Sequence, residues 1–515
     1  MNALKAIFSA LSSQGHVLIS ALRFGRFELE RESKTSGVWL VQAVDDPAFL
    51  LRFYFYLLSS RDLGEHPRVI WINTRLLFKS GKSARARFLD FFTQGPIYLW
   101  IWKLLYLKIL KAHWIQYRPL EISIQTKIRA QKIYESIRAK EDLERLVIDG
   151  LKVGDLIYDT YLRFKPAPTV NLKDPLVVEL ISVCLELVPR VEQCLREERV
   201  TRVVTGYVTY LQHGILARVA LRAGIELHSM GAFNQLVVNP TPDFPYQRRR
   251  FRSYPEMFKS VRDPEAALAA GKKLIEDRIT GKKDELTFYM KQSSFSESGS
   301  SEVKAYLKKI IGDRQAILIM GHDFFDSPHI YGEMLYPDFL EWVNACMSLA
   351  SKSPYKILFK PHPNSVTDES VILKDLSERY PEVEILPSTI SNRQLMQLHP
   401  AFLLTVYGTV AYEFASQGLK VLCCGENPHQ CYGFSKLITD RYELEQIILG
   451  QKSPDFDINL SEIHEYVYLH SYRIQKGELE LYPWELDFKS LPHFLAEQRK
   501  RVEVMKEALL NINQI

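Results

Sequence analysis

The chain has few cysteines and no long apolar run, which argues against a disulfide-rich protein and against a transmembrane protein. Six cysteines in 515 residues fit neither a disulfide framework nor zinc-ligand spacing, so we expect a reducing compartment. No run of about 18 uncharged apolar residues occurs, which predicts that no transmembrane helix is present. Polar residues interrupt the apolar patch of residues 1–22, and we therefore expect no cleaved signal peptide. These features predict a cytoplasmic protein.

The chain also lacks a strong charge of either sign. It has 66 basic and 61 acidic residues and a formal net charge of +5, a balance that predicts no nucleic-acid partner. Two segments stand apart: residues 88–114, rich in aromatics and lysines, and the basic cluster Arg248, Arg249 and Arg250. One interpretation is a peripheral contact with the inner face of a membrane. The alternative is a helix packed on the N-terminal domain and a solvated loop.

What is present is the composition of a large globular protein, 46% hydrophobic and 25% charged, long enough for two to four domains. Short apolar runs alternate with helical patterns in both halves. This alternation of strands and helices predicts an α/β fold with two Rossmann-like doubly wound domains and a C-terminal helical tail. We expect an N-terminal α/β domain with a helical insertion over 1–290, a linker over 291–302, a C-terminal domain over 303–450 and the tail over 451–515.

Two motifs follow predicted strands of the C-terminal domain. The first is Phe359-Lys360-Pro361-His362-Pro363-Asn364, and the second is Tyr407-Gly408-Thr409-Val410-Ala411-Tyr412-Glu413. Because parallel strands share one carboxyl edge, where open α/β sheets bind ligands, we expect the motifs to converge. Lys360 and His362 can donate to phosphate oxygens, and Gly408 and Thr409 open a helix whose N–H groups favour an anion. The carboxylate of Glu413 can accept from ribose hydroxyls. Together they predict a nucleotide-phosphate site.

A third cluster follows the first predicted strand of this domain and should reach the same edge. It contains His322, Asp323, Asp326 and His329. The spacing fits no established metal motif, so we expect His322, Asp323 and Asp326 to line the cleft rather than to bind a metal. No Asp-X-Asp motif is evident at a sheet edge, which favours a metal-independent site. We expect no cofactor apart from a nucleotide-activated substrate.

The Lys-Pro-His-Pro element, the Gly-Thr-Val-Ala-Tyr-Glu helix start and the strand Val421–Gly425 with Asn427-Pro428-His429 resemble the capsule polysaccharide biosynthesis family. That family includes the bacterial β-Kdo transferases and is more distantly similar to bacterial sialyltransferases and CDP-glycerol glycerophosphotransferases. The resemblance is strongest over residues 316–434. It implies a GT-B fold, a donor phosphate contacted by His362, and phosphate or ribose held by Gly408 and Thr409.

The resemblance implies a glycosyltransferase that moves a sugar from a nucleotide donor, with CMP among the candidate nucleotides, to a surface polysaccharide or lipid-linked acceptor. An inverting transfer needs a general base for the acceptor hydroxyl. Asp159 is the first candidate and His213 the second, with Asp155 also available; each has a structural alternative as a turn, cap or core residue. Other interpretations stay open: a CDP-polyol phosphotransferase, a non-catalytic carbohydrate-assembly subunit, or an epimerase on a related fold.

Overall fold

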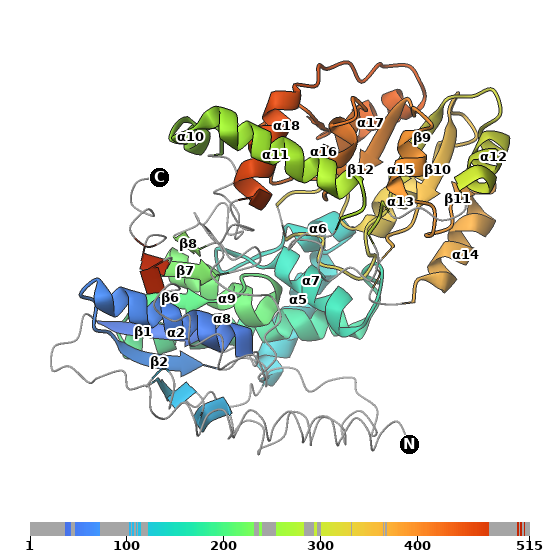
Figure 1. Ribbon diagram of the computed structural model, residues 1–515. Helices are drawn as coiled ribbons and strands as arrows, with labels where there is room; N and C mark the ends of the chain where they lie inside the picture. The colour runs from blue at the N-terminus through green and yellow to red at the C-terminus, as the bar shows by residue number, and fades with distance from the viewer. Residues whose placement is uncertain are drawn as a thin grey trace, which may run out of the picture. The chain divides into compact units, whose positions relative to one another are not determined.

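The computed structural model describes most of the chain between residues 37 and 472. The described residues are 37–42, 47–72, 102–104, 106, 107, 110, 112–114, 122–230, 236–238, 254–282, 293–295, 300–330, 332–363, 365, 368–472, 502, 503, 505, 506 and 509. Contacts divide the chain into two compact units (Figure 1). Unit 1 comprises residues 1–133, 178–247 and 477–515, and unit 2 comprises residues 134–177 and 248–476.

Unit 1 contains a six-stranded sheet of order β3-β2-β1-β6-β7-β8, in which only the edge strand β8 is antiparallel to its neighbour. Buried β-branched residues fill the central strands, as expected where helices cover both faces. Helices α2 and α9 belong to this unit, while α5 and α8 cross its boundary. The bounds are β1 Val38–Gln42, α2 Pro47–Asp62, β2 Arg68–Ile72, β3 His113–Trp114, α5 Ile124–Ser136, α8 Pro175–Glu197, β6 Val200–Thr205, α9 Tyr210–Arg222, β7 Glu226–Met230 and β8 Leu236–Val238.

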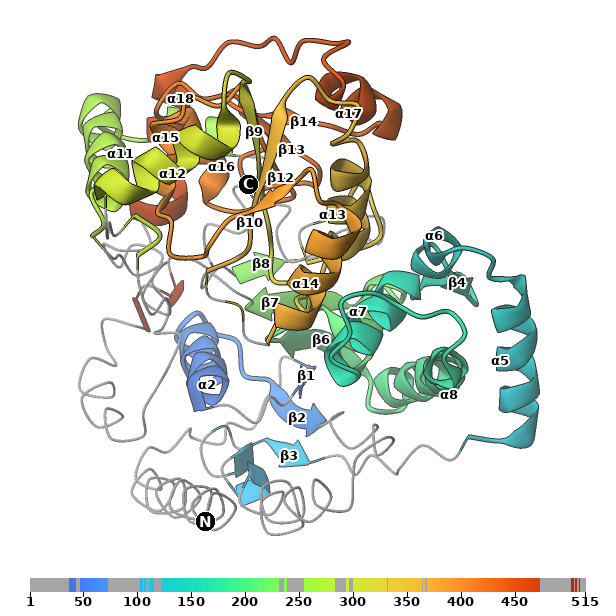
Figure 2. The ribbon, with the colours of Figure 1, turned by 90° about the vertical axis from the view of Figure 1, so that its right-hand side faces the viewer.

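Unit 2 contains a second six-stranded sheet, of order β11-β10-β9-β12-β13-β14, and every pairing in it is parallel. Figure 2 labels β9, β10, β12, β13 and β14 of this sheet. The strands are β9 Ala316–Met320, β10 Lys356–Lys360, β11 Glu384–Ile385, β12 Phe402–Thr405, β13 Val421–Cys423 and β14 Lys436–Leu437. The helices among and after them are α12 Ser300–Ile311, α13 Phe339–Ser348, α14 Ser370–Arg379, α15 Asn392–Met396, α16 Val410–Ala415, α17 Arg441–Ile448 and α18 Leu460–Val467. The predicted fold class is confirmed: the chain is α/β with two Rossmann-like sheets, as a GT-B fold requires.

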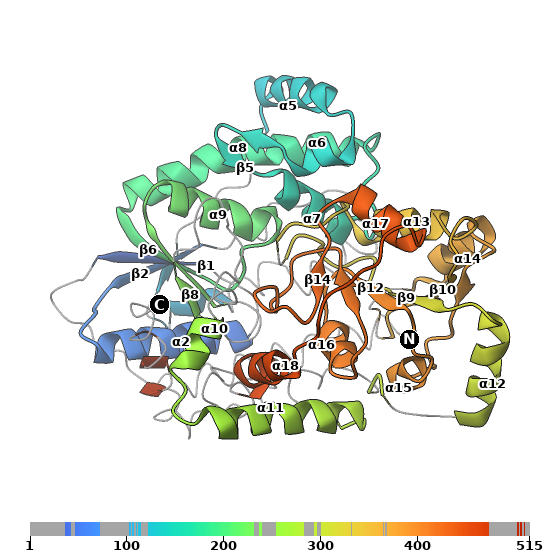
Figure 3. The ribbon, with the colours of Figure 1, turned by 90° about the horizontal axis from the view of Figure 1, so that it is seen from above.

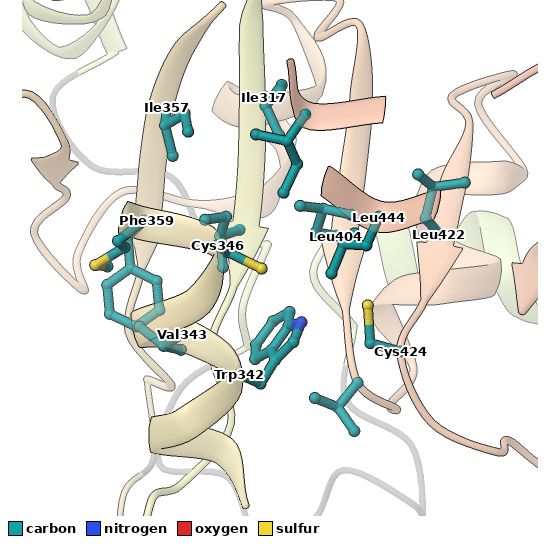
Figure 4. Close-up of a cluster of buried hydrophobic side chains, with 14 of the residues drawn as sticks. Ile317, Trp342, Val343, Cys346, Ile357, Phe359, Leu404, Leu422, Cys424 and Leu444 are labelled. Atoms are coloured by element: carbon teal, nitrogen blue, oxygen red, sulfur yellow. The ribbon is translucent and has the colours of Figure 1, made fainter. Parts of the chain in front are cut away.

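The core of unit 2 follows the two-residue period of its strands. Alternate residues of four neighbouring strands share one face and are fully buried against α13 and α17 (Figure 4). From α13, Trp342, Val343 and Cys346 pack on this face, and Leu444 comes from α17. Cys346 and Cys424 are buried free thiols, which agrees with a structural role. This packing fixes the carboxyl ends of the strands, where the candidate site lies.

Two helix starts in unit 2 show how the sequence sets the element bounds. The carboxylate of Asp263 accepts from the amide of Ala266, and Pro264 follows at the first position of α11 (Pro264–Ile279). Ser391 and Gln394 form a reciprocal capping box at α15. Helix α11 packs against α18 (Figure 3), so part of the predicted tail belongs to unit 2. From the same tail, Met505 is buried in unit 1.

Residues 134–177 form a small helical segment that belongs to unit 2, although the sequence pattern assigns it to the N-terminal domain. It contains α6 (Lys140–Glu144), an antiparallel hairpin of β4 (Val147–Ile148) and β5 (Leu151–Lys152), and α7 (Gly154–Phe164). Helix α7 is buried over nearly its whole length. Gly154 lies where a Cβ would come 1.9 Å from the carbonyl oxygen of Leu143, so α6 and α7 require glycine there. The predicted boundaries at 290, 302 and 450 remain predictions.

Candidate functional site

The order of the strands in unit 2 creates a switch point between β9 and β12. From β9 the chain moves to β10 and β11 on one side, and then returns to β12, β13 and β14 on the other. The loops that leave β9 and β12 therefore diverge, and ligands of open α/β sheets bind in the crevice at such a point. The loop after β9 contains His322 and Asp323, and the loop after β12 contains Tyr407, Gly408 and Thr409. Predicted site residues thus flank the switch point.

His322 is the centre of an aromatic group at this edge. Its ring stacks on Phe339, with centroids 4.3 Å apart and planes 14° apart, and on His362 at 5.8 Å and 29°. The ring of Tyr407 meets it edge-on at 4.6 Å. The structure therefore brings together His362 from the first motif, His322 from the third and Tyr407 from the second, as the sequence predicts.

Burial disfavours the protonated form of both imidazoles at the switch point. Burial lowers the pKa of His362 to about 4, and the nearby His322 and Lys360 add to this effect. Burial also lowers the pKa of His322, against the opposing charge of Asp326 and Asp323. A neutral imidazole offers one N–H donor and one acceptor nitrogen. An anion placed here would favour the protonated forms, so binding of phosphate and uptake of protons are coupled.

Lys360 ends β10 and lies inside the protein. Its side chain is 2% exposed, and its ammonium donates to Oδ1 of Asn392 at 2.7 Å. The backbone N–H of Asn392 donates to the carbonyl of Ser294 at 2.7 Å. Burial lowers the pKa of Lys360 to about 8, and the charge of Glu413 opposes this shift. The ammonium is thus engaged with protein groups, and its predicted contact with phosphate stays a prediction.

Glu413 lies in a buried ion pair. It is 3% exposed, and its Oε1 lies 3.5 Å from Nη1 of Arg278 on α11. Arg278 is also buried; it donates to the hydroxyl of Tyr412 and lies over that ring, 5.6 Å from its centroid. The sequence pattern did not identify Arg278, because it lies 135 positions away. The structure offers Glu413 a charged protein partner where the sequence predicted a ribose hydroxyl.

The loop after β12 is held by Asn427. Gly408 has φ +136°, a conformation that other residues rarely adopt, and its N–H donates to Oδ1 of Asn427 at 3.2 Å. The amide nitrogen of Asn427 donates to the carbonyls of Val406 and Gly425 at 3.0 and 2.8 Å. Thr409 occupies the predicted N-cap position of the six-residue helix α16, but its side chain makes no cap hydrogen bond. Asn427 therefore positions the turn that the Gly-Thr motif predicted.

The carboxylates of the loop after β9 organise that loop. Oδ1 of Asp323 accepts from the amide of Phe325 at 2.9 Å, and Oδ1 of Asp326 accepts from Ser327 at 2.8 Å. The hydroxyl of Tyr407 donates to the carbonyl of Ser327 at 3.0 Å. Within the described residues, no group of three or more His, Cys, Asp or Glu side chains could hold a metal ion. The metal-independent site remains a prediction.

Asp159, the first candidate base, lies in unit 2 and is buried. Its Oδ1 is 2.7 Å from Nδ1 of His329, and the other ring nitrogen is 3.5 Å from Oε1 of Glu144. Burial opposes a charged imidazole, but the two carboxylates outweigh it and raise the pKa of His329 to about 10. Burial also raises the pKa of Asp159, against the effect of His329. Asp155 is buried one turn earlier in the same helix.

His213, the second candidate base, lies in unit 1 on the first turn of α9, after β6. Strands β1 and β6 flank the switch point of this sheet, where the hydroxyl of Thr205 donates to Gln42 at 2.7 Å. Burial lowers the pKa of His213 to about 3, and its Nδ1 has no hydrogen-bond partner in the described part of the chain. A base with so low a pKa is weak, since general bases work best with a pKa near the operating pH.

The membrane predictions fall largely outside the described residues. Arg248, Arg249 and Arg250 lie outside them, as do residues 88–101. Of the described residues in 88–114, Trp102, Tyr106 and Leu110 are buried, and Tyr106 stacks on Trp71 at 4.7 Å. This packing matches the alternative interpretation of the segment. Among the described helices, none has both the length and the apolar character needed to cross a bilayer.

Comparisons with known proteins give only distant likenesses. No family model and no curated protein matches the sequence. Among solved structures, KpsC from Thermosulfurimonas dismutans, a β-Kdo 2,7 transferase, is 15% identical, with 54% of this chain and 80% of that chain covered and a TM-score of 0.28. UDP-GlcNAc 2-epimerase from Neisseria meningitidis is 12% identical, with 84% of this chain and 98% of that chain covered and a TM-score of 0.26. MurG from Acinetobacter baumannii is 10% identical, with 86% of this chain and 98% of that chain covered and a TM-score of 0.24. These scores are too low to assign an activity.

Proposed function

We propose that the chain is a glycosyltransferase that binds a nucleotide-sugar donor at the β9–β12 switch point of unit 2. The observation that carries this proposal is the convergence of His322, His362 and the Gly408 turn at that point. Three motifs separated by up to 86 residues meet at the edge where α/β sheets bind ligands. The parallel sheet brings the strand ends together, and the residue types found there, two histidines and a Gly-Thr turn, are those that suit an anion.

The chemistry of these residues suits the phosphates of a nucleotide. The two imidazoles can each donate to a phosphate oxygen, and Gly408 permits close approach of the backbone because no side chain stands there. His322 and His362 are partly exposed, whereas Phe339 is fully buried and supports the ring of His322 by stacking on it. A hydrogen bond to a charged group contributes about 1.5–3 kcal/mol, so two imidazole contacts account for a substantial part of a micromolar affinity.

The acceptor and the cellular setting come from the sequence resemblance. We propose a surface polysaccharide or a lipid-linked saccharide as acceptor, in capsule or O-antigen-type biosynthesis, and a location in the cytoplasm at the inner face of the membrane. The donor nucleotide stays open, with CMP among the candidates. The general base stays a prediction between Asp159 and His213, and the site contacts of Lys360, Thr409 and Glu413 stay predictions too.

The proposal is tested first by nucleotide binding. Thermal shift with CMP, CDP, UDP, GDP and dTDP should show one nucleotide that raises the melting temperature of the protein. His322→Asn and His362→Asn should each weaken the affinity about 10- to 100-fold, the effect of one lost charge-assisted hydrogen bond. His399→Asn is the matched control, because His399 is exposed on another loop.

Mass spectrometry of the reaction products then separates the activities. A transferred sugar with release of the nucleotide supports the glycosyltransferase. Transfer of a polyol phosphate with release of CMP would instead identify a phosphotransferase. Failure of all five nucleotides to bind would refute the proposed site and favour a non-catalytic assembly subunit.

A further inference from the structure

The loop that carries His322 is tied at two places to one helix. This loop, residues 321–338, connects β9 to α13 and forms one wall of the proposed nucleotide site. The helix is α7 of the 134–177 segment, which belongs to the same unit. Two consecutive residues of α7, Tyr158 and Asp159, make the two ties. Both are at most 2% exposed.

The first tie is the ion pair of Asp159 with His329. The two side chains are each 2% exposed, and their atoms Oδ1 and Nδ1 lie 2.7 Å apart. Glu144 of α6 lies 3.5 Å from the other ring nitrogen, and the ring of Tyr158 meets the imidazole edge-on at 5.5 Å. Removing one partner of a buried pair leaves a buried charge uncompensated. The middle of the loop is thus held where it is by charge.

The second tie is the hydrogen bond of Tyr158 to Asp338. The carboxylate of Asp338 accepts from the hydroxyl of Tyr158 at 2.5 Å and from that of Thr169 at 2.6 Å. Its other oxygen accepts from the amide of Glu341 at 2.8 Å and caps α13. The next residue, Phe339, is the one on which His322 stacks. The tie therefore fixes the residue that orients an imidazole of the site.

The geometry points to Tyr158 and Asp159 as positioning residues of the nucleotide site: they hold the 321–338 loop so that His322 faces His362. This inference rests on the proposed function for the identity of the ligand. It also gives Asp159 a different role from that of general base, because the carboxylate is buried and bonded to His329. A general base must reach the proton that it removes.

A matched pair of variants on α7 tests the inference. Tyr158 and Tyr161 are both buried, and both donate a hydroxyl to a carboxylate, but Tyr161 donates to Asp174 at 2.9 Å within the 134–177 segment. Tyr158→Phe and Tyr161→Phe each remove one such bond and should lower the melting temperature similarly. Only Tyr158→Phe should weaken nucleotide binding, by about fivefold or more, and only it should speed amide hydrogen exchange in residues 321–338.

Asp159→Asn separates positioning from catalysis. A positioning residue predicts a nucleotide dissociation constant raised at least tenfold, because the loop loses its charged tie. A general base predicts an unchanged dissociation constant with a turnover number lowered about 100-fold or more. The second pattern would overturn the inference for Asp159.

The outcomes also separate this inference from the proposed function. If the wild-type protein binds no nucleotide, the proposed function fails, and hydrogen exchange still decides whether Tyr158 holds the loop. If the wild type binds nucleotide but Tyr158→Phe and Tyr161→Phe match it in affinity and in exchange over residues 321–338, the positioning role is refuted while the nucleotide site stands.

Discussion

The buried charges around Glu413 give a sharp prediction about unit 2. Arg278 and Glu413 are each 4% exposed in their side chains and 3.5 Å apart, and the charge of Glu413 also acts on the buried ammonium of Lys360. Glu413→Gln keeps the size of the side chain but leaves two buried cations without a carboxylate. Breaking a buried pair in this way costs about 3–5 kcal/mol, so we expect a loss of this size in the free energy of unfolding.

The companion variant should cost less. Arg278→Met removes one cation, but the charge of the buried Lys360 still acts on Glu413. We therefore expect Glu413→Gln to destabilise unit 2 more than Arg278→Met, and the double variant to recover part of the loss. Asp277→Asn, next to Arg278 on α11, is the control, since Asp277 faces Lys273 and Lys282 at the surface and its loss should leave stability nearly unchanged.

Urea denaturation, with hydrogen exchange of α16 amides to report on unit 2, measures these differences. Two results together would refute the reasoning: equal stability of Glu413→Gln and wild type, and a ribonucleotide affinity that is weaker in the variant while the affinity for the matching 2′-deoxyribonucleotide is unchanged. That result would instead assign Glu413 to the ribose.

Three further predictions follow from the same structure. Gly408→Ala should cost about 1–3 kcal/mol in urea denaturation through backbone strain alone, because a Cβ there meets nothing within 4 Å; an unchanged midpoint would contradict the φ of +136°. Burial lowers the pKa of His429 from its ordinary value to about 3, so the unfolded state binds the proton first. As pH drops from about 6.5 towards 3, His429 should contribute a loss of stability of about 1.4 kcal/mol per pH unit, in addition to the losses from His213 and His362. His429→Asn should flatten this slope, and an identical pH profile in the variant would show that His429 is not its source. Because the pKa of His362 is also lowered, to about 4, nucleotide binding should take up a proton and strengthen as pH falls from 8 to 6, by at most tenfold per unit; calorimetry in buffers of different ionisation enthalpy would detect no proton uptake if this were wrong.

Local patterns predicted the sheets of this protein well. The strands β9, β10, β12 and β13 are short apolar runs between loop signals, and their alternate residues pack as the two-residue period requires. The convergence of His322 and His362 followed from the same rule, because the carboxyl ends of parallel strands share an edge. Residues that directly follow a predicted strand could therefore be placed at the sheet edge from the sequence.

Partners far apart in sequence were not predictable. Asn392 lies 32 positions from Lys360, Arg278 lies 135 from Glu413, and Asp159 lies 170 from His329. The periodicity of a helix or a strand relates only residues a few positions apart, so it cannot reveal partners at these sequence separations. Lys360 and Glu413 were therefore interpreted as ligand contacts, whereas the structure gives them buried protein partners. The same limit explains why the 134–177 segment was assigned to the N-terminal domain: its membership in unit 2 is decided by tertiary contacts alone.

The central claim, that a nucleotide binds at the β9–β12 switch point, is tested most directly by observing the two imidazoles. In protein labelled with ¹³C at the histidine Cε1 position, the His322 and His362 resonances, assigned from the His322→Asn and His362→Asn variants, should shift during titration with the nucleotide that stabilises the protein. The resonance of the exposed His399 should stay in place. Saturation of binding with both site resonances unmoved would contradict the account.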